Sequence, residues 1–417
     1  MARILLLPHA PTVGLAHVGA CLEVGRELRS RGHEVTVAYG GTRPEIIEQE
    51  RFAWHRVPDV SPEREWHPAG WFSSTDELRH HVETHVRLLG RLRPHVAVSS
   101  SGIAGRLACE LMGVPQLQLM HYLATTPYGR RPVVWGNRLR DARRPRRLIR
   151  VARARMLSLR RPGGAPPTRR VVDRVRAELG LPAAGPEAFV GARDSTVAIT
   201  TAPFLDPARG LPPNWRYVGP LAWSPAAPPG VALPQRGERP LVYVTQGSTG
   251  DPDLLKWVVG GLAGAEFELL VTTGGLCEPS ELERLAPNVK AADLLPGDAC
   301  LSAADAAVIH GGHLTFCQAL MAGTPIAITP YRSDQIGRIH RAERLGVGIG
   351  LWPRPWLPGA IGRAARRLLN DARYRRRAAD IAHRLQGRWD GRRNCADLAE
   401  RLAREGRADA NVAAGGR

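Results

Sequence analysis

The chain has 417 residues and a formal net charge of +19, with 58 basic and 39 acidic side chains. This length fits two or three domains with sizeable cores. Hydrophobic residues make up 43% and charged residues 23%, ordinary values that exclude wholesale disorder, a collagen-like repeat and a coiled coil. Only Lys256 and Lys290 are lysines, an arginine skew typical of GC-rich codon usage. Because no zinc-finger, basic-zipper or RNP motif accompanies it, we expect no nucleic-acid partner.

The six cysteines are scattered, without a CxxC pair or a histidine at zinc-finger spacing. We therefore expect neither a metal site nor a disulfide framework, which fits a reducing cytoplasm. The apolar run Met1–Pro8 is too short for a signal peptide. No stretch approaches the roughly 18–20 apolar residues that span a bilayer. The sequence predicts a cytoplasmic protein.

Strands and helices alternate from the first residues. An apolar run at Arg3–Leu7 precedes a helical pattern over Val18–Arg31, which Gly32 closes, and Glu34–Tyr39 has the composition of a strand. This order is a βαβ unit of a parallel sheet. Three more strand-like runs follow, at Val96–Ser99, Gln116–Met120 and Val197–Thr200.

A proline-rich stretch, Gly219–Pro240, interrupts this rhythm and has the composition of a linker. The pattern then restarts, with strands expected at Leu241–Thr245, Phe267–Thr272, Ala306–Ile309 and Pro325–Ile328, and helices at Pro252–Leu262 and Thr315–Ala322. The sequence predicts an α/β protein of two doubly wound Rossmann-like domains facing across a cleft. We expect domains at 1–218 and 241–385, a linker at 219–240, and a C-terminal helix with a disordered tail at 386–417.

One segment departs from the rhythm. Arg138–Arg176 contains 15 arginines, and apolar residues within it recur at helical spacing. One interpretation is a basic amphipathic helix that touches a membrane surface weakly or meets an anionic acceptor. The other is a solvated arginine-rich insertion without a ligand.

The strongest candidate site is His310–Thr315, which reads HGGHLT between the strand Ala306–Ile309 and the following helix. Glycines at such a turn let the backbone approach a ligand, and a helix N-terminus directs N–H groups and its positive dipole end at an anion. His310 and Thr315 would add side-chain donors, which suits a phosphate. The alternative is a tight turn in which His310 only caps the helix.

Two further segments support a ligand site. Asp334 and Gln335 lie side by side after the strand that ends at Ile328, where a carboxylate and an amide can bind vicinal sugar hydroxyls. Gly247 and Ser248 follow the strand Leu241–Thr245 and can form a second wall for phosphates.

Together these segments resemble the GT-B glycosyltransferases that use nucleotide sugars, family 1 type, especially bacterial enzymes that glycosylate macrolides and other secondary metabolites. In the C-terminal half the resemblance is carried by Val218–Pro220, Val242–Ser248, Asn288, Pro296, Ser302–Ile309, His310–Thr315, Gly323–Pro325, Pro330, Asp334 and Gln335. In the N-terminal half it is carried by Ala16–Ala20, which contains His17, and by Arg31–Val35.

The resemblance implies an inverting glycosyltransferase that moves a sugar from a UDP- or dTDP-sugar to a hydroxyl, or another nucleophile, of a small-molecule acceptor. His17 would be the general base, because a neutral imidazole at a helix N-terminus accepts a proton near pH 7. The donor would lie in the C-terminal domain against Gly247, Ser248, Leu295, His310, Gly311, Gly312, Thr315, Gln318, Asp334 and Gln335. The acceptor, an aglycone or a glycoside, would lie in the N-terminal domain against Trp66, Trp71 and His121. We expect no cofactor and no metal, and a monomer or homodimer.

The chain departs from the family pattern at several sites. Many relatives orient the base histidine with an aspartate after a later strand, whereas Pro94–Ser101 carries serines, of which Ser100 could be a weak substitute. Gln318 stands where many uridine-nucleotide users have a ribose-binding glutamate. The missing aspartate, with Leu314 in place of a glycine, leaves an alternative: a catalytically weak auxiliary protein that activates a partner glycosyltransferase. A dinucleotide-binding oxidoreductase is disfavoured, because residues 8–19 lack GxGxxG.

Overall fold

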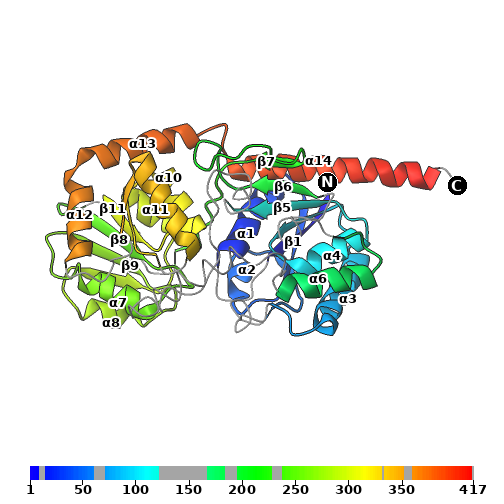
Figure 1. Ribbon diagram of the computed structural model, residues 1–417, viewed down its shortest axis with the longest axis horizontal. Helices are drawn as coiled ribbons and strands as arrows, with labels where there is room; N and C mark the ends of the chain where they lie inside the picture. Colours follow the sequence, from blue (N-terminus) through cyan, green and yellow to red (C-terminus); the bar gives the residue numbers. More distant parts are fainter. Residues whose placement is uncertain are drawn as a thin grey trace, which may run out of the picture.

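The computed structural model describes residues 1–8, 15–60, 71–121, 167–183, 195–227, 237–330, 333–351 and 359–415, with the side chains of 167, 333, 334 and 407–415 excepted. Two α/β units lie side by side (Figure 1). Each is built on a parallel sheet, which confirms the predicted fold class.

The N-terminal sheet has the strand order β3-β2-β1-β4-β5-β6-β7 among the described residues. Its strands are β1 (Arg3–Pro8), β2 (Glu34–Tyr39), β3 (Ala53–Arg56), β4 (Val96–Ser100), β5 (Gln116–Met120), β6 (Thr196–Ile199) and β7 (Trp215–Tyr217). Its helices are α1 (Leu15–Ser30), α2 (Glu45–Gln49), α3 (Thr75–Leu92), α4 (Ile103–Leu111) and α6 (Pro167–Glu178).

The central strand β1 is buried on both faces, and its side chains alternate between two cores. Ile4 and Leu6 belong to the core that contains α1. Leu5 and Leu7 belong to the core that contains α3 and α4. Helices therefore cover both faces of the sheet, which leaves the carboxyl ends of its strands as the place where loops gather.

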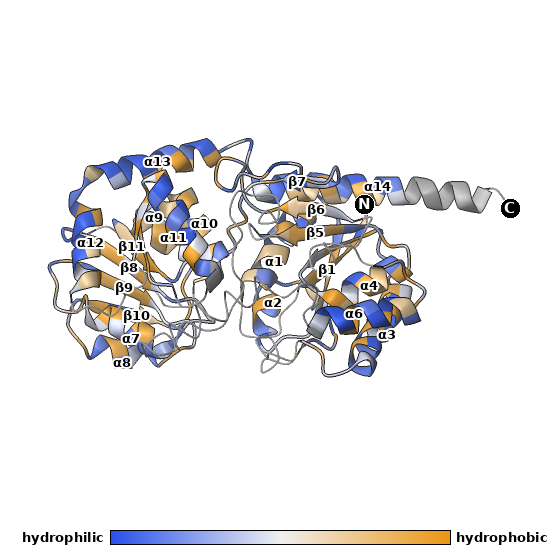
Figure 2. Ribbon diagram, in the orientation of Figure 1, coloured by the Kyte–Doolittle hydropathy of each residue, from blue (hydrophilic) through white to orange (hydrophobic). Residues whose placement is uncertain are grey.

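The C-terminal sheet has the strand order β10-β9-β8-β11-β12-β13. Its strands are β8 (Leu241–Thr245), β9 (Glu268–Thr272), β10 (Val289–Ala292), β11 (Ala306–Ile309), β12 (Ile326–Ile328) and β13 (Gly348–Gly350). Its helices are α7 (Pro252–Gly260), α8 (Pro279–Glu283), α9 (Gly297–Ala303), α10 (His313–Ala322), α11 (Ser333–Leu345), α12 (Ala360–Asn370) and α13 (Ala372–Leu385). Figure 2 shows the apolar strands inside and the polar outer face of α13.

The two halves exchange segments. After β6, Ala202 and Leu205 pack in a core of the C-terminal half. In the other direction α14 (Gly391–Gly415) lies along the N-terminal unit (Figure 1), where Cys395 packs in the core that contains Cys21 of α1. Each half therefore completes its core with residues from the other.

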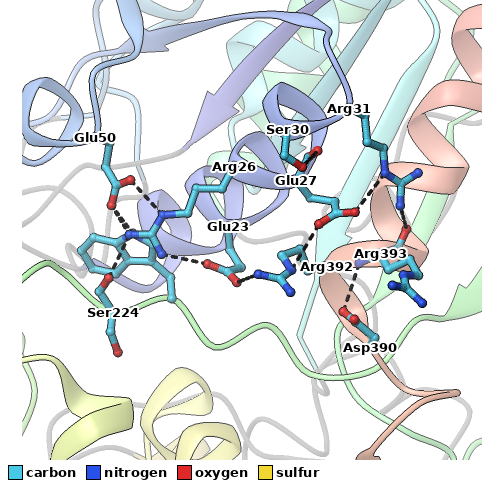
Figure 3. A network of polar contacts seen from close by, with 11 residues as sticks. Glu23, Arg26, Glu27, Ser30, Arg31, Glu50, Ser224, Asp390, Arg392 and Arg393 are labelled. Carbon is cyan, nitrogen blue, oxygen red and sulfur yellow. Dashed lines mark hydrogen bonds and ion pairs between the residues drawn. The ribbon is translucent and has the colours of Figure 1, made fainter.

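Ion pairs fasten the returning helix to α1 (Figure 3). Arg31 Nη1 lies 2.6 Å from an Asp397 carboxylate oxygen. Arg392 reaches Glu27 at 3.4 Å, as Figure 3 shows. Beside them Arg26 pairs with Glu23 at 3.1 Å and also with Glu50.

Two expectations differ from the structure or fall outside it. We expected a disordered tail from Gly406, whereas α14 continues to Gly415, because the alanines, arginines and glutamates that precede the end favour helix. Residues 138–166 of the arginine-rich segment lie outside the described residues, so the membrane-surface contact stays a prediction. Among the described helices, none is both long and apolar enough to cross a bilayer.

Candidate active site between the two sheets

The strand ends of the two sheets meet at the domain boundary. The backbone N–H of Leu15, the first residue of α1, donates to Ser248 Oγ at 3.4 Å. Ser248 follows β8, so this contact joins the loop region after β1 to the loop after β8. Ligands of doubly wound sheets bind at such carboxyl ends.

His17 lies in the first turn of α1 and is partly exposed. Its Nδ1 lies 2.8 Å from Ser100 Oγ, at the end of β4. In the tautomer in which Nδ1–H donates to this hydroxyl, Nε2 is the nitrogen that can accept a proton. The first turn of a helix also favours a neutral imidazole over an imidazolium.

The backbone around Ser100 is tightly defined. Ser100 is paired with Pro8 in the β1–β4 register and is 3% exposed. The next residue, Ser101, has φ +63°, a left-handed conformation that is uncommon for a residue other than glycine and is concentrated at functional sites. Ser100 is the substitute that the sequence suggested for the family's aspartate.

Three imidazole rings form a row across the boundary. The ring centroids of His17 and His121 are 6.5 Å apart, and those of His121 and His313 are 5.7 Å apart. His121 follows β5, and His313 is the first residue of α10. His121, predicted to contact the acceptor, therefore lies near the predicted base.

The protonation state of His313 follows from its partners. Its Nδ1 lies 2.6 Å from Arg338 Nη2, and its Nε2 lies 3.0 Å from the Thr200 carbonyl oxygen. Arginine can only donate, so Nδ1 accepts and Nε2–H donates to Thr200. Burial and the charge of Arg338 hold the pKa of His313 well below its usual range, and the ring is neutral.

A buried charge cluster stands behind this histidine. Arg338 Nη1 lies 3.1 Å from Asp206 Oδ2, and Arg341 reaches Asp206 at 3.3 Å. Thr201 Oγ1 donates to the same carboxylate at 2.7 Å. Two guanidinium groups thus face one carboxylate among the described side chains of this cluster. Burial and then Arg338 lower the pKa of His121 to about 4.

The glycine-rich turns of the C-terminal domain touch each other. A Cβ at Gly247 would lie 2.8 Å from His310 Cε1, and a Cβ at Gly312 would lie 2.2 Å from His310 Nε2. Gly311 has φ +88°, and its side-chain position faces the Gln335 backbone oxygen at 3.4 Å. The structure therefore gathers four predicted donor residues around His310.

The other predicted donor residues lie as follows. Thr315 is in the first turns of α10, and Asp334 is in the first turn of α11, although the Asp334 side chain lies outside the described part of the chain. Gln318 Nε2 donates to the Trp223 carbonyl oxygen at 2.8 Å and to Ser224 Oγ at 3.0 Å. Leu295 packs in the core of this half.

A small N-terminal pocket of about 30 Å³ lies at the ends of β1 and β4. Its lining includes Pro8, Asp59, Trp71, Phe72, His81 and Gly102. Trp71 was predicted to contact the acceptor, whereas Trp66 lies outside the described residues. Burial lowers the pKa of His81 and also that of His85, another lining residue, so both rings are neutral near pH 7.

Sequence reasoning missed Arg338, Asp206 and the role of His313. Arg338 lies three residues after Gln335 on α11, but its partner Asp206 is 132 residues away in the chain. Only the fold reveals that pairing. Within the described ranges, no three His, Cys, Asp or Glu side chains are grouped as metal ligands.

Comparison with known proteins identifies relatives of the whole chain. The erythromycin biosynthesis protein CIII-like C-terminal domain matches residues 256–388. The chain is 29% identical over 391 residues to a PGL/p-HBAD biosynthesis rhamnosyltransferase of Mycobacterium bovis (strain BCG / Pasteur 1173P2), covering 91% of this chain and 83% of that protein. It is 32% identical over 243 residues to the 4'-demethylrebeccamycin synthase of Lentzea aerocolonigenes, covering 56% of each. A Mycobacterium bovis relative described as an inactive PGL/p-HBAD biosynthesis glycosyltransferase is 27% identical over 270 residues, covering 62% of this chain and 70% of that protein.

Solved structures share the fold. The calicheamicin glycosyltransferase CalG4 aligns with a TM-score of 0.69 and 20% identity, covering 96% of this chain and 98% of that one. The glycosyltransferase VinC, solved in complex with dTDP, aligns with a TM-score of 0.67 and 17% identity, covering 97% and 100%.

Two facing Rossmann-like sheets, with a glycine-rich turn at the boundary, define the GT-B class of glycosyltransferases. The relatives agree with this class in sequence as well as in fold. The chain is a glycosyltransferase with the GT-B fold, and its residues 256–388 match the erythromycin biosynthesis protein CIII-like C-terminal domain.

Proposed function

We propose that this glycosyltransferase moves a sugar from a UDP- or dTDP-sugar to a hydroxyl, or another nucleophile, of a small secondary-metabolite acceptor, with inversion at the anomeric carbon. The observation that carries the proposal is the hydrogen bond of His17 Nδ1 to Ser100 Oγ at 2.8 Å. It holds an imidazole at the domain boundary, where we propose that Nε2 acts as the base. The contact of Leu15 with Ser248 joins this helix end to the donor loops.

The donor diphosphate would lie against His310, Gly311 and Gly312, at the N-terminus of α10. Backbone N–H groups and the positive end of the helix dipole stabilise anions there, and Ser248 and Thr315 would add hydroxyl donors. We propose that these groups meet the charge that grows on the leaving diphosphate without a metal ion. Asp334 and Gln335 would hold the sugar hydroxyls. VinC, which shares the fold, was solved in complex with dTDP, and this supports a nucleoside diphosphate as the leaving group.

The chemical step would be a single displacement. His17 Nε2 takes the proton of the acceptor hydroxyl while its oxygen bonds to the anomeric carbon from the face opposite the diphosphate. The bond from that carbon to the diphosphate oxygen breaks, and its electron pair leaves with the diphosphate. The acceptor would lie in the N-terminal unit beside Trp71. The names of the relatives, a rhamnosyltransferase and the rebeccamycin synthase, support a natural-product glycoside.

Thermal unfolding with nucleotides tests the donor half. A ligand at a hundredfold excess over its Kd adds about 2.7 kcal/mol of stability, so UDP or dTDP should raise Tm, and NAD should not. His310→Ala should remove the response, and His383→Ala, an exposed histidine on α13, should keep it. If a folded wild type responds to neither nucleotide, the donor assignment is wrong.

Turnover tests the catalytic half. His17→Ala should lower kcat by about 10²–10⁴ while nucleotide binding persists. Product NMR should show the anomeric configuration opposite to that of the donor, and EDTA should not reduce the rate. Retained configuration would exclude the single displacement.

A second candidate is an auxiliary protein that activates a partner glycosyltransferase. One relative, described as inactive, favours it, as does Ser100 in place of the usual aspartate. Such a protein would bind the partner and transfer no sugar alone. Transfer by the purified chain would therefore exclude this candidate.

A further inference from the structure

A chain of hydrogen bonds crosses the boundary between the two units. β6 lies in the N-terminal sheet and α10 in the C-terminal unit (Figure 1), and Thr200, directly after β6, contacts His313 at the start of α10. We propose that His313 is a positioning residue of the transfer reaction, which holds the donor-binding turn of α10 at a fixed distance from the acceptor side of the N-terminal unit. The inference rests on the proposed function, because it names a residue that aligns the two substrates of that reaction.

The N-terminal end of this chain lies at the carboxyl end of β5. The Met120 carbonyl oxygen accepts from the Thr200 backbone N–H at 2.8 Å and from Thr200 Oγ1 at 3.0 Å. Met120 precedes His121, the residue predicted to contact the acceptor, whose ring centroid lies 6.5 Å from that of His17. Thr200 is therefore fixed by two bonds beside the expected place of the acceptor and the proposed base.

The C-terminal end of the chain lies at the glycine-rich turn. His313 directly follows Gly311 and Gly312, against which the donor diphosphate would lie. Its Nε2 lies 3.0 Å from the Thr200 carbonyl oxygen and 3.0 Å from Thr200 Oγ1. Because the Thr200 hydroxyl donates its own proton to Met120, both Thr200 oxygens can accept from Nε2–H. The first residue of α10 is thereby bonded to the acceptor side.

Arg338 holds the same ring from its other side. Arg338 Nη2 donates to His313 Nδ1 at 2.6 Å, and Nη1 donates to Asp206 Oδ2 at 3.1 Å. Its Cζ lies 4.6 Å from the centroid of the Phe316 ring of α10. The imidazole is therefore held at both nitrogens, Nδ1 by α11 and Nε2 by the segment after β6. It cannot turn without breaking one of these hydrogen bonds.

This link acts on the geometry of transfer rather than on nucleotide affinity. The groups that would bind the diphosphate are backbone N–H groups and the helix dipole, which persist when the ring of His313 is replaced. The anomeric carbon, in contrast, must approach the acceptor oxygen to about 3–3.5 Å, and a misplacement of about 1 Å can cost about 10²-fold in rate. Replacing the ring should therefore lower kcat and leave the Kd of the nucleotide almost unchanged.

Two replacements at position 313 test this split between kcat and Kd. His313→Phe keeps an aromatic ring and loses both hydrogen bonds, whereas His313→Gln keeps one donor and one acceptor. We expect kcat to fall at least about 30-fold in His313→Phe and to stay within about fivefold of wild type in His313→Gln. The Kd of UDP or dTDP, measured by calorimetry, should change less than about threefold in either variant.

Transfer is measured with whichever of UDP-glucose, UDP-rhamnose and dTDP-rhamnose serves as donor, and with the phenol or cyclohexanol that wild type glycosylates fastest. If His313→Phe keeps kcat within about threefold of wild type, or loses as much nucleotide affinity as kcat, the inference is overturned and the proposed function stands. Equal losses of kcat in His313→Phe and His313→Gln would also overturn it. No transfer by folded wild type to any acceptor, with nucleotide binding intact, would overturn both.

Leu320→Ala separates the positioning role from a loss of stability. Leu320 is a buried core residue of α10, further along the helix than His313. Its truncation leaves a cavity and should lower Tm at least as much as His313→Phe does, yet kcat should stay within about threefold of wild type. If kcat falls equally in both variants, destabilisation of α10 explains both losses and the inference is overturned.

Two observations decide the question if His313→Phe does not fold. Heteronuclear NMR of histidine-labelled wild type should show a ring with its proton on Nε2, assigned by its absence in His313→Gln. Thr200→Val removes the side-chain bond to Met120 and one acceptor of Nε2–H, so it should lower kcat about threefold to tenfold at unchanged nucleotide Kd. A proton on Nδ1 of His313, or an unchanged kcat in Thr200→Val, would overturn the inference.

Discussion

Removing the carboxylate of Asp206 should destabilise the protein by about 3–5 kcal/mol. Asp206 is 3% exposed and faces Arg338, whose side chain is 1% exposed, at 3.1 Å. Breaking a buried pair leaves an uncompensated buried charge, which is the reason for a cost of roughly this size. The same carboxylate also accepts from Thr201 at 2.7 Å. The value is measured by urea unfolding of Asp206→Ala, followed by circular dichroism.

Two further variants test whether the uncompensated buried charge causes the loss of stability in Asp206→Ala. The double variant Asp206→Leu/Arg338→Met removes the two most buried charges and leaves only Arg341, whose side chain is 17% exposed. It should recover at least half of the loss, since apolar replacements of buried pairs are often near neutral. Arg373→Ala breaks an exposed pair with Asp371 and should not change stability measurably. A loss below about 1 kcal/mol in Asp206→Ala would refute the reasoning, because that is the value of a solvated pair.

Three further perturbations have defined outcomes. Gly312→Ala places a Cβ 2.2 Å from His310 Nε2, so it should weaken UDP or dTDP binding at least about tenfold in calorimetry. Gly219→Ala, at φ +100° with a Cβ 2.0 Å from the Trp389 carbonyl oxygen, should lower the free energy of unfolding by about 2–3 kcal/mol in urea. Burial lowers the pKa of His85, so below pH 6.5 the unfolded chain binds a proton that the folded protein does not. Stability should therefore fall on acidification by at most about 1.4 kcal/mol per pH unit from this residue, and His85→Gln should remove that slope in urea unfolding between pH 7.5 and 5.5.

These predictions have a control variant and outcomes that would contradict them. Gly260→Ala, where an added Cβ meets nothing within 4 Å, should leave both stability and nucleotide binding unchanged. Unaltered nucleotide affinity in Gly312→Ala would mean that His310 does not face the donor. If the free energy of unfolding changes with pH equally in wild type and His85→Gln, His85 is protonated in the folded protein.

The sheets could be predicted from sequence because both are buried and parallel. Runs such as Val96–Ser99 and Ala306–Ile309 are continuously apolar or small, so the sequence alone indicates that both faces of these strands are buried. The meeting of Gly247 with His310 follows as well. Both residues come directly after neighbouring parallel strands, β8 and β11, whose carboxyl ends share an edge.

The contacts between the halves could not be predicted, since no local pattern encodes them. Asp206 and Arg338 are each isolated in sequence, and only the packing of the segment after β6 against α11 brings them together. The contact of Gln318 with the crossing segment could not be predicted from sequence either. Its place in the motif suggests a ribose contact, whereas its amide donates to the Trp223 carbonyl oxygen of the crossing segment.

The return of α14 to the first sheet has a consequence for biosynthesis. Cys395 and Ala399 fill the core around Cys21, so the N-terminal unit lacks part of its interior until almost the whole chain has left the ribosome. The N-terminal unit therefore remains incompletely packed while the C-terminal unit is synthesised and folds. During that time the side of α1 that later contacts α14 is exposed. The N-terminal unit is thus synthesised first, but its core is completed last. A chain whose synthesis ends before Gly391 lacks α14 and leaves this core incomplete.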